Sequence, residues 1–367
     1  MDRDELGAWL RLAMAPGIGR VGARRLLAAF GLPQQVFAAE PQALKAAGAG
    51  PAAVQALAAE PQGWGEQVDL TWQWLQAERA TRRLLTLADP RYPQSLLQTE
   101  DPPLLLFAQG QPADTWPRAI SVVGSRNPTA QGRINALQFG RTFAQAGLTV
   151  VSGLALGVDG AAHEGALDGA PAGQLATIAV VGTGLDRVYP SQHLQLAHRI
   201  ADRGLLLSEY LLGTPPLAEN FPQRNRIISG LGLGTLVVEA ALQSGSLITA
   251  RMAIEQGKDV FAIPGSIHSP QARGCHALLK QGAKLVETAQ DVLEELAPGA
   301  HVPAATRTAP PEQPLLGAMG YDPVGLDALV ARTGMSTASL QAELLELELQ
   351  GRVARLPGGL FQRVEQG

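Results

Sequence analysis

The spacing of apolar residues predicts short helices over residues 1–85. Leu6 and Leu10 stand four residues apart, and Leu26 and Phe30 repeat that interval beyond a turn containing two glycines. This interval places apolar side chains on one face of a helix. A weaker copy of the same pattern follows, again around a glycine-rich turn. We therefore expect a small helical domain of the helix-hairpin-helix or SAM-like type.

From residue 104 the pattern changes, because apolar runs of strand length alternate with helical stretches. Near-continuous apolar strands separated by helices indicate a parallel sheet covered on both faces. We expect a doubly wound, Rossmann-like α/β domain over residues 86–297. The expected strands are residues 104–108, 119–123, 148–152, 175–181, 204–208, 235–239, 259–263 and 283–286.

The end of the chain predicts a linker and a third unit. Residues 298–314 are rich in proline and alanine without periodicity, which is typical of a linker. Residues 315–367 show a helix, a turn, a second helix and a hairpin, which is a winged-helix pattern. The second helix carries Glu343, Glu346 and Glu348 and would meet DNA phosphates with like charge. We expect this winged helix to contact protein or its own chain, and not the major groove of DNA.

Composition narrows the class of protein. The chain has 367 residues, is 46% hydrophobic and carries a formal net charge of −4, so nucleic-acid binding requires a local basic patch. Cys275 is the only cysteine, which allows no disulfide within the chain and fits a reducing cytoplasm. No apolar run of the sequence approaches membrane-spanning length. We expect a cytoplasmic protein without a membrane partner.

No cofactor, metal or catalytic residue is predicted. Residues 17–22 match the dinucleotide fingerprint, but helical sequence precedes them where that fingerprint needs a strand. Asp159 and His163 lie four residues apart and share a helix face, so an acid/base or metal pair is one interpretation. We favour the other, an aspartate that accepts from helix amides and holds the histidine, because no third ligand accompanies them.

Small and polar residues follow the expected strands. The carboxyl ends of the strands of an open parallel sheet form a binding crevice, where small residues let backbone amides approach an anion. The set as a whole therefore favours phosphate. Its members are Gly124, Ser125, Arg126, Ser152, Gly153, Gly182, Thr183, Gly184, Ser244, Gly245 and Ser246.

A second signal is the motif Arg224-Asn225-Arg226. Pro222 suits the start of a helix, so the arginines lie near a first turn, where the helix dipole attracts anions. For the pair we favour contact with a ligand. The alternative is that one arginine pairs with a carboxylate to lock the domain, the candidates being Glu209, Glu219 and Glu239.

These motifs together resemble the DNA-processing protein A (DprA/Smf) family. The resemblance covers about residues 85–297. It is carried by the segments 121–126, 152–155, 157–159, 162–163, 182–186, 189–190, 208–210, 220–222, 224–230 and 244–251. It implies a non-enzymatic, single-stranded DNA-binding protein of natural transformation and competence. Family members bind incoming single strands through the Rossmann-like domain, protect them, load the RecA recombinase for DNA recombination, and commonly form homodimers.

Carried onto this chain, the resemblance implies DNA contacts at Arg126, Arg224 and the glycine–serine loops, with Phe221 and Asn225 in the most specific motif. Ile254, in the helix after Ser246, is a candidate for the dimer interface. Two departures bear on the site. Leu156 stands where the family often has a basic residue, and Ser191-Gln192-His193 stands where a lysine and an asparagine are common.

Two other functions are compatible with parts of the sequence. Related Rossmann-like proteins bind nucleotides and cleave nucleoside monophosphates, but they carry a glycine-rich loop ending in glutamate, where this chain has Ser244-Gly245-Ser246. A transcriptional regulator would use the winged helix, and the acidic second helix argues against that role.

Overall fold

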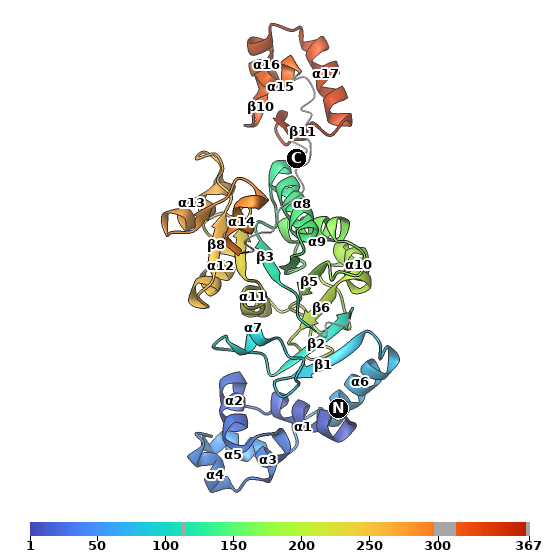
Figure 1. Cartoon of the computed structure of the whole chain (residues 1–367), viewed down its shortest axis with the longest axis vertical. Coiled ribbons are helices and arrows are strands. Elements are labelled where there is room, and N and C mark those ends of the chain that lie inside the picture. The colour runs from blue at the N-terminus through green and yellow to red at the C-terminus, as the bar shows by residue number, and fades with distance from the viewer. Residues whose placement is uncertain (112–114, 297–312, 365–367) are drawn as a thin grey trace.

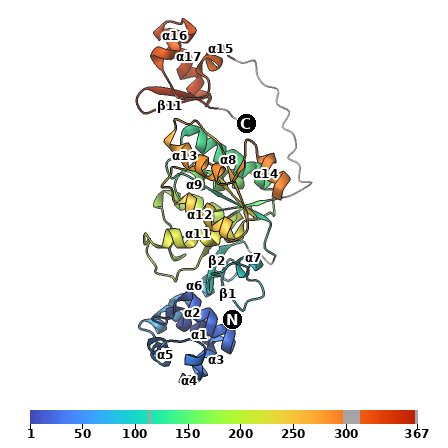
Figure 2. The ribbon, with the colours of Figure 1, turned by 90° about the vertical axis from the view of Figure 1, so that its left-hand side faces the viewer.

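The computed structural model describes residues 1–111, 115–296 and 313–364. Figures 1 and 2 show three parts that follow one another along the long axis: a helical unit, a sheet domain and a small C-terminal unit. Most of the linker expected at 298–314 lies outside the described residues, and Pro314 already begins a helix. Within the described part of the chain, no helix is both long and apolar enough to cross a bilayer.

The N-terminal unit consists of six helices packed around Leu6, Trp9 and Leu10, which are buried. Prolines at the first turns of three of these helices suit positions where the backbone N–H has no helical partner. The helices are α1 Arg3–Met14, α2 Gly19–Phe30, α3 Pro33–Ala38, α4 Pro41–Ala46, α5 Pro51–Ala58 and α6 Trp64–Ala77.

The central domain is built on a nine-stranded sheet with the order β1-β2-β6-β5-β4-β3-β7-β8-β9. Every pairing from β6 to β9 in that order is parallel. The strands are β1 Arg82–Thr86, β2 Leu105–Gly110, β3 Ala119–Val123, β4 Thr149–Ser152, β5 Thr177–Val180, β6 Leu205–Ser208, β7 Gly234–Val237, β8 Asp259–Ala262 and β9 Lys284–Leu285.

The first two strands of this order correct the predicted sheet. β1 was not predicted, and both the β1–β2 and the β2–β6 pairings are antiparallel. β1 crosses the boundary expected at residue 85, since Leu84 and Leu85 pair with Phe107 and Leu106. The sheet therefore begins at Arg82, and the domain is a mostly parallel α/β structure with an antiparallel edge.

Helices cover both faces of the sheet (Figure 1). On β3, Ile120 and Val122 belong to the core under one helical layer, whereas Ala119 and Val123 belong to the other. Burial on both faces explains why these strands are near-continuous apolar runs. One layer contains α8 Ala130–Gln145, α9 Val158–Gly169, α10 Leu194–Arg203 and α14 Ala289–Leu296. The other contains α7 Gln94–Leu97, α11 Asn220–Leu231, α12 Ser246–Glu255 and α13 Arg273–Lys280.

Glycines let α8 and α9 approach each other backbone to backbone. A Cβ atom added at Gly165 would lie 1.9 Å from the carbonyl oxygen of Leu137. One added at Gly140 would lie 2.4 Å from the carbonyl oxygen of Ala162. Such separations are far below van der Waals contact, so any side chain at these positions would force the two helices apart.

The C-terminal unit has its own core, with Leu316, Leu329, Leu340 and Phe361 buried in it. Ser336 caps the second predicted helix by accepting from the backbone N–H of Ser339. The predicted helix, turn, helix and hairpin are present, with one further short helix and strand. The elements are α15 Pro314–Met319, β10 Val324–Gly325, α16 Leu326–Thr333, α17 Thr337–Leu349, β11 Val353–Leu356 and β12 Leu360–Arg363.

Candidate nucleic-acid interface

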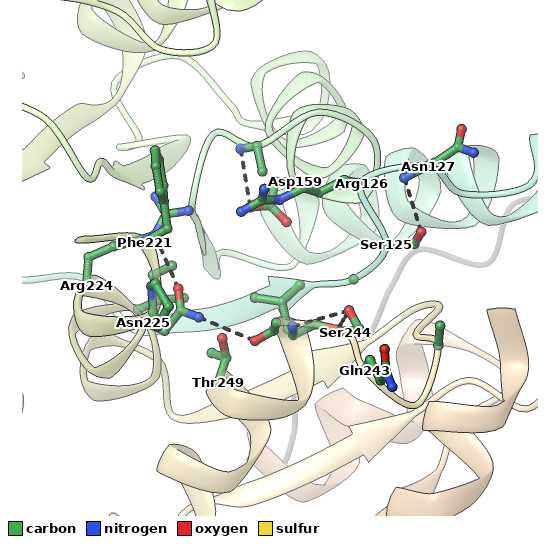
Figure 3. Close-up of a pocket in the computed structure, with 18 of the residues that line it drawn as sticks. Ser125, Arg126, Asn127, Asp159, Phe221, Arg224, Asn225, Gln243, Ser244 and Thr249 are labelled. Atoms are coloured by element: carbon green, nitrogen blue, oxygen red, sulfur yellow. Dashed lines mark hydrogen bonds between the residues drawn. The ribbon is translucent and has the colours of Figure 1, made fainter. Parts of the chain in front are cut away.

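A crevice of about 530 Å³ opens at the carboxyl ends of β3 and β7 (Figure 3). The chain runs from β3 to β4 on one side, while β7 lies on the other side of β3. This is the switch point at which open α/β sheets bind ligands. Three segments form the walls: the loop after β3, the start of α11, and the loop from β7 into α12.

Arg126 supplies an accessible positive charge at the mouth of the crevice. Its side chain is exposed, and its guanidinium carbon lies 5.7 Å from the centroid of the Phe221 ring. Across the described ranges, Arg126 takes part in none of the ion pairs. Ser125 organises the loop beneath it, because its hydroxyl oxygen accepts from the backbone N–H of Asn127 at 3.1 Å. Arg126 is thus free to meet a phosphate.

Arg224 lines the same crevice but is buried, with 4% of its surface exposed. Its Nη1 donates to the carbonyl oxygen of Gly153 at 2.5 Å and to that of Val180. Burial lowers its pKa to about 10 despite the opposing charge of Asp159, so the side chain stays protonated at neutral pH. Arg224 is therefore a fixed charge in the wall whose donors are partly committed to the main chain.

The loop after β4 does not offer the amides that the sequence predicted for phosphate. Asp159 Oδ2 accepts from the backbone N–H of Gly153 at 3.1 Å and from that of Ala155 at 3.3 Å. Ser152 is buried, and its hydroxyl donates to the carbonyl oxygen of Val122. Burial raises the pKa of Asp159 in spite of Arg224. The hydroxyl of Ser152 and the amide of Gly153 are thus used in hydrogen bonds that hold the crevice wall together.

The second member of the predicted pair, His163, is not held by Asp159. Its Nδ1 lies 2.7 Å from the hydroxyl oxygen of Thr177, and both side chains are buried. The favoured interpretation was therefore wrong about the partner of the histidine, and it was wrong about the amides, which belong to the loop before α9. His163 faces Thr177 on β5 because the helix packs on that strand.

Arg226 lies outside the crevice. It forms an ion pair with Asp101 at 3.0 Å and another with Glu209. Residues two apart on a helix point in roughly opposite directions, about 200° around the axis. The two arginines of the motif therefore point to different sides of the helix. Arg226 pairs with Glu209, which is the alternative role that the sequence left open.

The loop after β5 is also structural. Gly182, Thr183 and Gly184 are buried and do not line the crevice. The side-chain amide of Asn220 donates to the carbonyl oxygen of Gly182 at 3.0 Å, so the start of α11 covers this loop. The segment after β6 completes the cover, since the backbone N–H of Gly184 donates to the carbonyl oxygen of Thr214. These glycines serve packing, contrary to the predicted anion contacts.

The β7–α12 loop does line the crevice, as predicted. The hydroxyl oxygens of Ser244 and Ser246 lie 2.7 Å apart, and Gly245 is the N-cap of α12. Asn225 reaches across from α11, and its side-chain amide donates to the carbonyl oxygen of Gly245 at 3.4 Å. Sequence reasoning missed several polar residues that also line the crevice. Asn127 and Gln243 adjoin strand-end motifs, Thr249 lies on α12, and Gln271 lies just before α13.

Two aromatic rings flank the charged mouth. The centroids of Tyr189 and Phe221 lie 5.4 Å apart with their planes tilted by 43°. They border a smaller cavity of about 70 Å³ that also touches Arg126 and the exposed Leu156. Rings in this position can stack with bases, and the sequence identified Tyr189 only as part of a motif. His193 is occupied, since its Nδ1 lies 3.0 Å from the carbonyl oxygen of Leu154.

Glu239, which the sequence offered as a possible partner of an arginine, has a different partner. Glu239 accepts from the backbone N–H of Thr129 at 2.9 Å and from its hydroxyl at 2.5 Å, next to the start of α8. Burial raises the pKa of Glu239. In the regions described, no cluster of three metal-ligating side chains is found. Cys275 is buried, and burial raises the pKa of its thiol to about 12.

Comparison with known protein families matches two parts of the chain. Residues 83–297 match a family described as DNA recombination-mediator protein A. Residues 297–359 match the DprA winged helix domain. The two matches correspond to the sheet domain and to the C-terminal unit.

Similar proteins come from several bacteria. Protein Smf of Escherichia coli is 42% identical over 78% of this chain and 78% of its own length. The solved structure of DNA processing protein A from Streptococcus pneumoniae has a TM-score of 0.64 and 37% identity, covering 78% of this chain and 96% of that one. A structure of the Helicobacter pylori protein, with a TM-score of 0.53 and 31% identity, covers 60% of this chain and 98% of that one. It concerns a single-stranded DNA binding mode.

Proposed function

The chain belongs to the DNA recombination-mediator protein A family, and from that premise we propose that it binds single-stranded DNA in the crevice between β3 and β7. We propose further that it protects incoming DNA and loads the RecA recombinase during natural transformation, in the cytoplasm. The family description names a mediator and no catalysed reaction. The Helicobacter pylori relative, whose structure concerns a single-stranded DNA binding mode, supports the choice of ligand.

One observation carries this proposal: the exposed Arg126 stands beside the rings of Phe221 and Tyr189 at the mouth of the crevice. A cation attracts the phosphate backbone, and every base offers a face that can stack on an aromatic ring. Binding by this pair of features tolerates any base sequence. It also favours single strands, because the bases of a duplex are already stacked and paired.

The contact set that we propose is smaller than the predicted one. Direct contacts are Gly124, Arg126, Phe221, Asn225, Ser244, Gly245 and Ser246, with Arg224 as a fixed charge behind them. Ser125 also lines the crevice, but its hydroxyl accepts from the backbone N–H of Asn127 and holds the loop. The remaining predicted residues support the walls: Ser152, Gly153, Gly182, Thr183, Gly184 and Arg226. The proposed contacts thus come from the loop after β3, the first turns of α11 and the loop between β7 and α12.

We propose a homodimer through the sheet domain, with α12 in the interface. Ile254 is 50% exposed on this helix, and Ile248, six residues earlier, is also exposed. Apolar side chains that face solvent on one helix suit an interface between subunits. Sedimentation equilibrium of Ile254→Glu would show a monomer if this helix holds the subunits together.

Fluorescence anisotropy with labelled oligothymidine tests the proposed function. We expect affinity to fall with rising salt and to exceed that for a duplex of equal length. Arg126→Ala should weaken binding about tenfold and lower the log–log salt slope by about 0.7, the value for one lost phosphate contact with a single strand. Arg199→Ala, an exposed arginine on α10 that is paired with Asp168, is the matched control. Salt-insensitive or duplex-preferring binding would contradict the proposal.

A further inference from the structure

Helix α11 connects the crevice to a second group of charges on its other side. Phe221 and Arg224 line the crevice, whereas Arg226 belongs to a cluster of five charged residues. We call it the arginine–carboxylate cluster. Its members are Arg20, Arg24, Asp101, Glu209 and Arg226.

Two of the five members come from helix α2 of the N-terminal unit. Arg20 Nε lies 2.9 Å from Asp101 Oδ2, and its Nη1 lies 3.5 Å from Glu209 Oε2. Arg24 forms an ion pair with the other oxygen of Asp101 and donates to the carbonyl oxygen of Glu100 at 2.8 Å. Asp101 therefore receives two arginines from the N-terminal unit and one from α11.

Arg20 also contacts α11 directly. Its Nη1 donates to the side-chain oxygen of Gln223 at 3.2 Å. Gln223 precedes Arg224 and follows the crevice residues Phe221 and Pro222 in the first turns of the helix. The N-terminal unit thus contacts α11 at the same turns that line the crevice.

Two members of this cluster, Glu209 and Arg226, are buried, which makes them sensitive to the loss of a partner. The side chain of Glu209 is 6% exposed and that of Arg226 is 11% exposed. Glu209 Oε1 and Arg226 Nη1 are buried without a hydrogen-bond partner among the described residues. Removing one partner of a buried pair leaves an uncompensated charge and is strongly destabilising. The position of α11 therefore depends on the pair of Arg226 and Glu209, to which Asp101 and Arg20 add further charge contacts.

The pKa values of the two carboxylates agree with this arrangement. Burial alone would raise the pKa of Asp101, but the hydrogen bond from Arg24 and the charges of Arg226 and Arg20 hold it below its usual range. Burial raises the pKa of Glu209, although Arg226 and Arg20 oppose the shift. Asp101 is the member that the arginines hold as a carboxylate, and it is the one on which three of them converge.

We infer that the N-terminal helical unit positions α11 for single-stranded DNA through the arginine–carboxylate cluster, with Asp101 as the central positioning residue. The inference rests on the proposed function, because it assumes that the crevice beside α11 binds the DNA. Affinity then depends on a unit that contributes no residue to the lining of the crevice.

Asp101→Asn tests this inference, because a positioning role and a simple charge effect predict opposite changes in DNA affinity. Loss of a negative charge alone strengthens binding of a polyanion. Positioning predicts the opposite, and we expect oligothymidine affinity to fall about five- to tenfold in the full chain. Asp69→Asn is the matched control, since it removes the same charge from an exposed pair with Arg3 in the N-terminal unit. We expect its affinity to be unchanged or slightly higher.

Hydrogen exchange supplies an independent measurement. Amides of α11 should exchange faster in Asp101→Asn, while those of β3 and β4 keep their wild-type rates. If Asp101→Asn does not fold, Arg20→Gln replaces it, and Arg25→Gln, an exposed neighbour on α2, becomes its control. Arg20→Gln should then weaken binding more than Arg25→Gln.

The outcomes distinguish this inference from the proposed function. Wild-type protein that does not bind oligothymidine contradicts the proposed function. Wild-type binding, together with unchanged or tighter binding by Asp101→Asn, overturns the positioning role whatever the exchange rates of α11. Weaker binding by Asp101→Asn and unchanged binding by Asp69→Asn support it.

Discussion

At the scale of single residues, the two ring nitrogens of His163 have different surroundings. The hydroxyl of Thr177 donates to the carbonyl oxygen of Val150 at 2.6 Å, so it accepts from His163 Nδ1. Nε2 is buried without a hydrogen-bond partner in the described part of the chain. The site therefore suits a neutral imidazole. Burial, followed by the charges of His193 and Arg224, lowers its pKa to about 3.

This environment predicts acid sensitivity. The unfolded chain protonates His163 near pH 6.5, whereas the folded protein does so only near pH 3, so the unfolded state binds more protons between these values. Stability is lost as the pH falls through this window, by about 4 kcal/mol for this group alone. Urea unfolding at pH 7, 5.5 and 4.5 should show a smaller loss for His163→Gln than for the wild type. Equal losses would contradict the prediction.

The residues of the site could be predicted by type more readily than by direction. Glycine, serine and arginine after a strand are typical of a loop that can hold an anion, and this pattern pointed to Arg126 and the Ser244 loop, both of which line the crevice. Which helix residues face the crevice depends on their direction around the helix axis and on partners that are distant in the sequence. Arg226 turns away because Asp101 lies on the other side of α11, 125 positions earlier in the chain. No local pattern contains that information.

At the scale of elements, the contact between α8 and α9 depends on glycine. We expect Gly165→Ala to reduce the free energy of unfolding by about 2–3 kcal/mol, because the added methyl group would overlap the carbonyl oxygen of Leu137. Gly65→Ala on α6 is the control, since no atom lies within 4 Å of its added Cβ. It should leave the protein unchanged or slightly more stable. Thermal unfolding of both variants measures the difference, and equal midpoints would contradict the role of Gly165.

Most of the strands that the sequence predicted are buried on both faces of the sheet. β3 to β8 are covered on both faces, so their sequences are nearly unbroken apolar runs. β1 begins with Arg82 and Arg83 and buries only its last three residues, too few to form such a run. The antiparallel direction of β2 could not be predicted, because strand composition does not encode direction relative to a neighbour.

At the scale of the whole molecule, the winged-helix unit has a core that shares no residue with the cores of the other parts. A chain ending at residue 297 should therefore bind oligothymidine within about twofold of the full-length protein, since no crevice residue is removed. Anisotropy of the two proteins under one salt condition measures this. Loss of binding would show that the winged helix contributes to the DNA site.

The two-residue offset between Arg224 and Arg226 has a consequence for how the chain can evolve. Arg224 donates to the backbone carbonyl oxygens of Gly153 and Val180. A side-chain substitution at either residue leaves those oxygens in place. Arg226 is held by the side chains of Asp101 and Glu209, which can mutate in compensation. A substitution at position 226 can therefore be compensated by substitutions at positions 101 and 209. A substitution at position 224 has no such compensation, because its partners are backbone atoms. A change at position 226 should accordingly be tolerated only together with matching changes at positions 101 and 209.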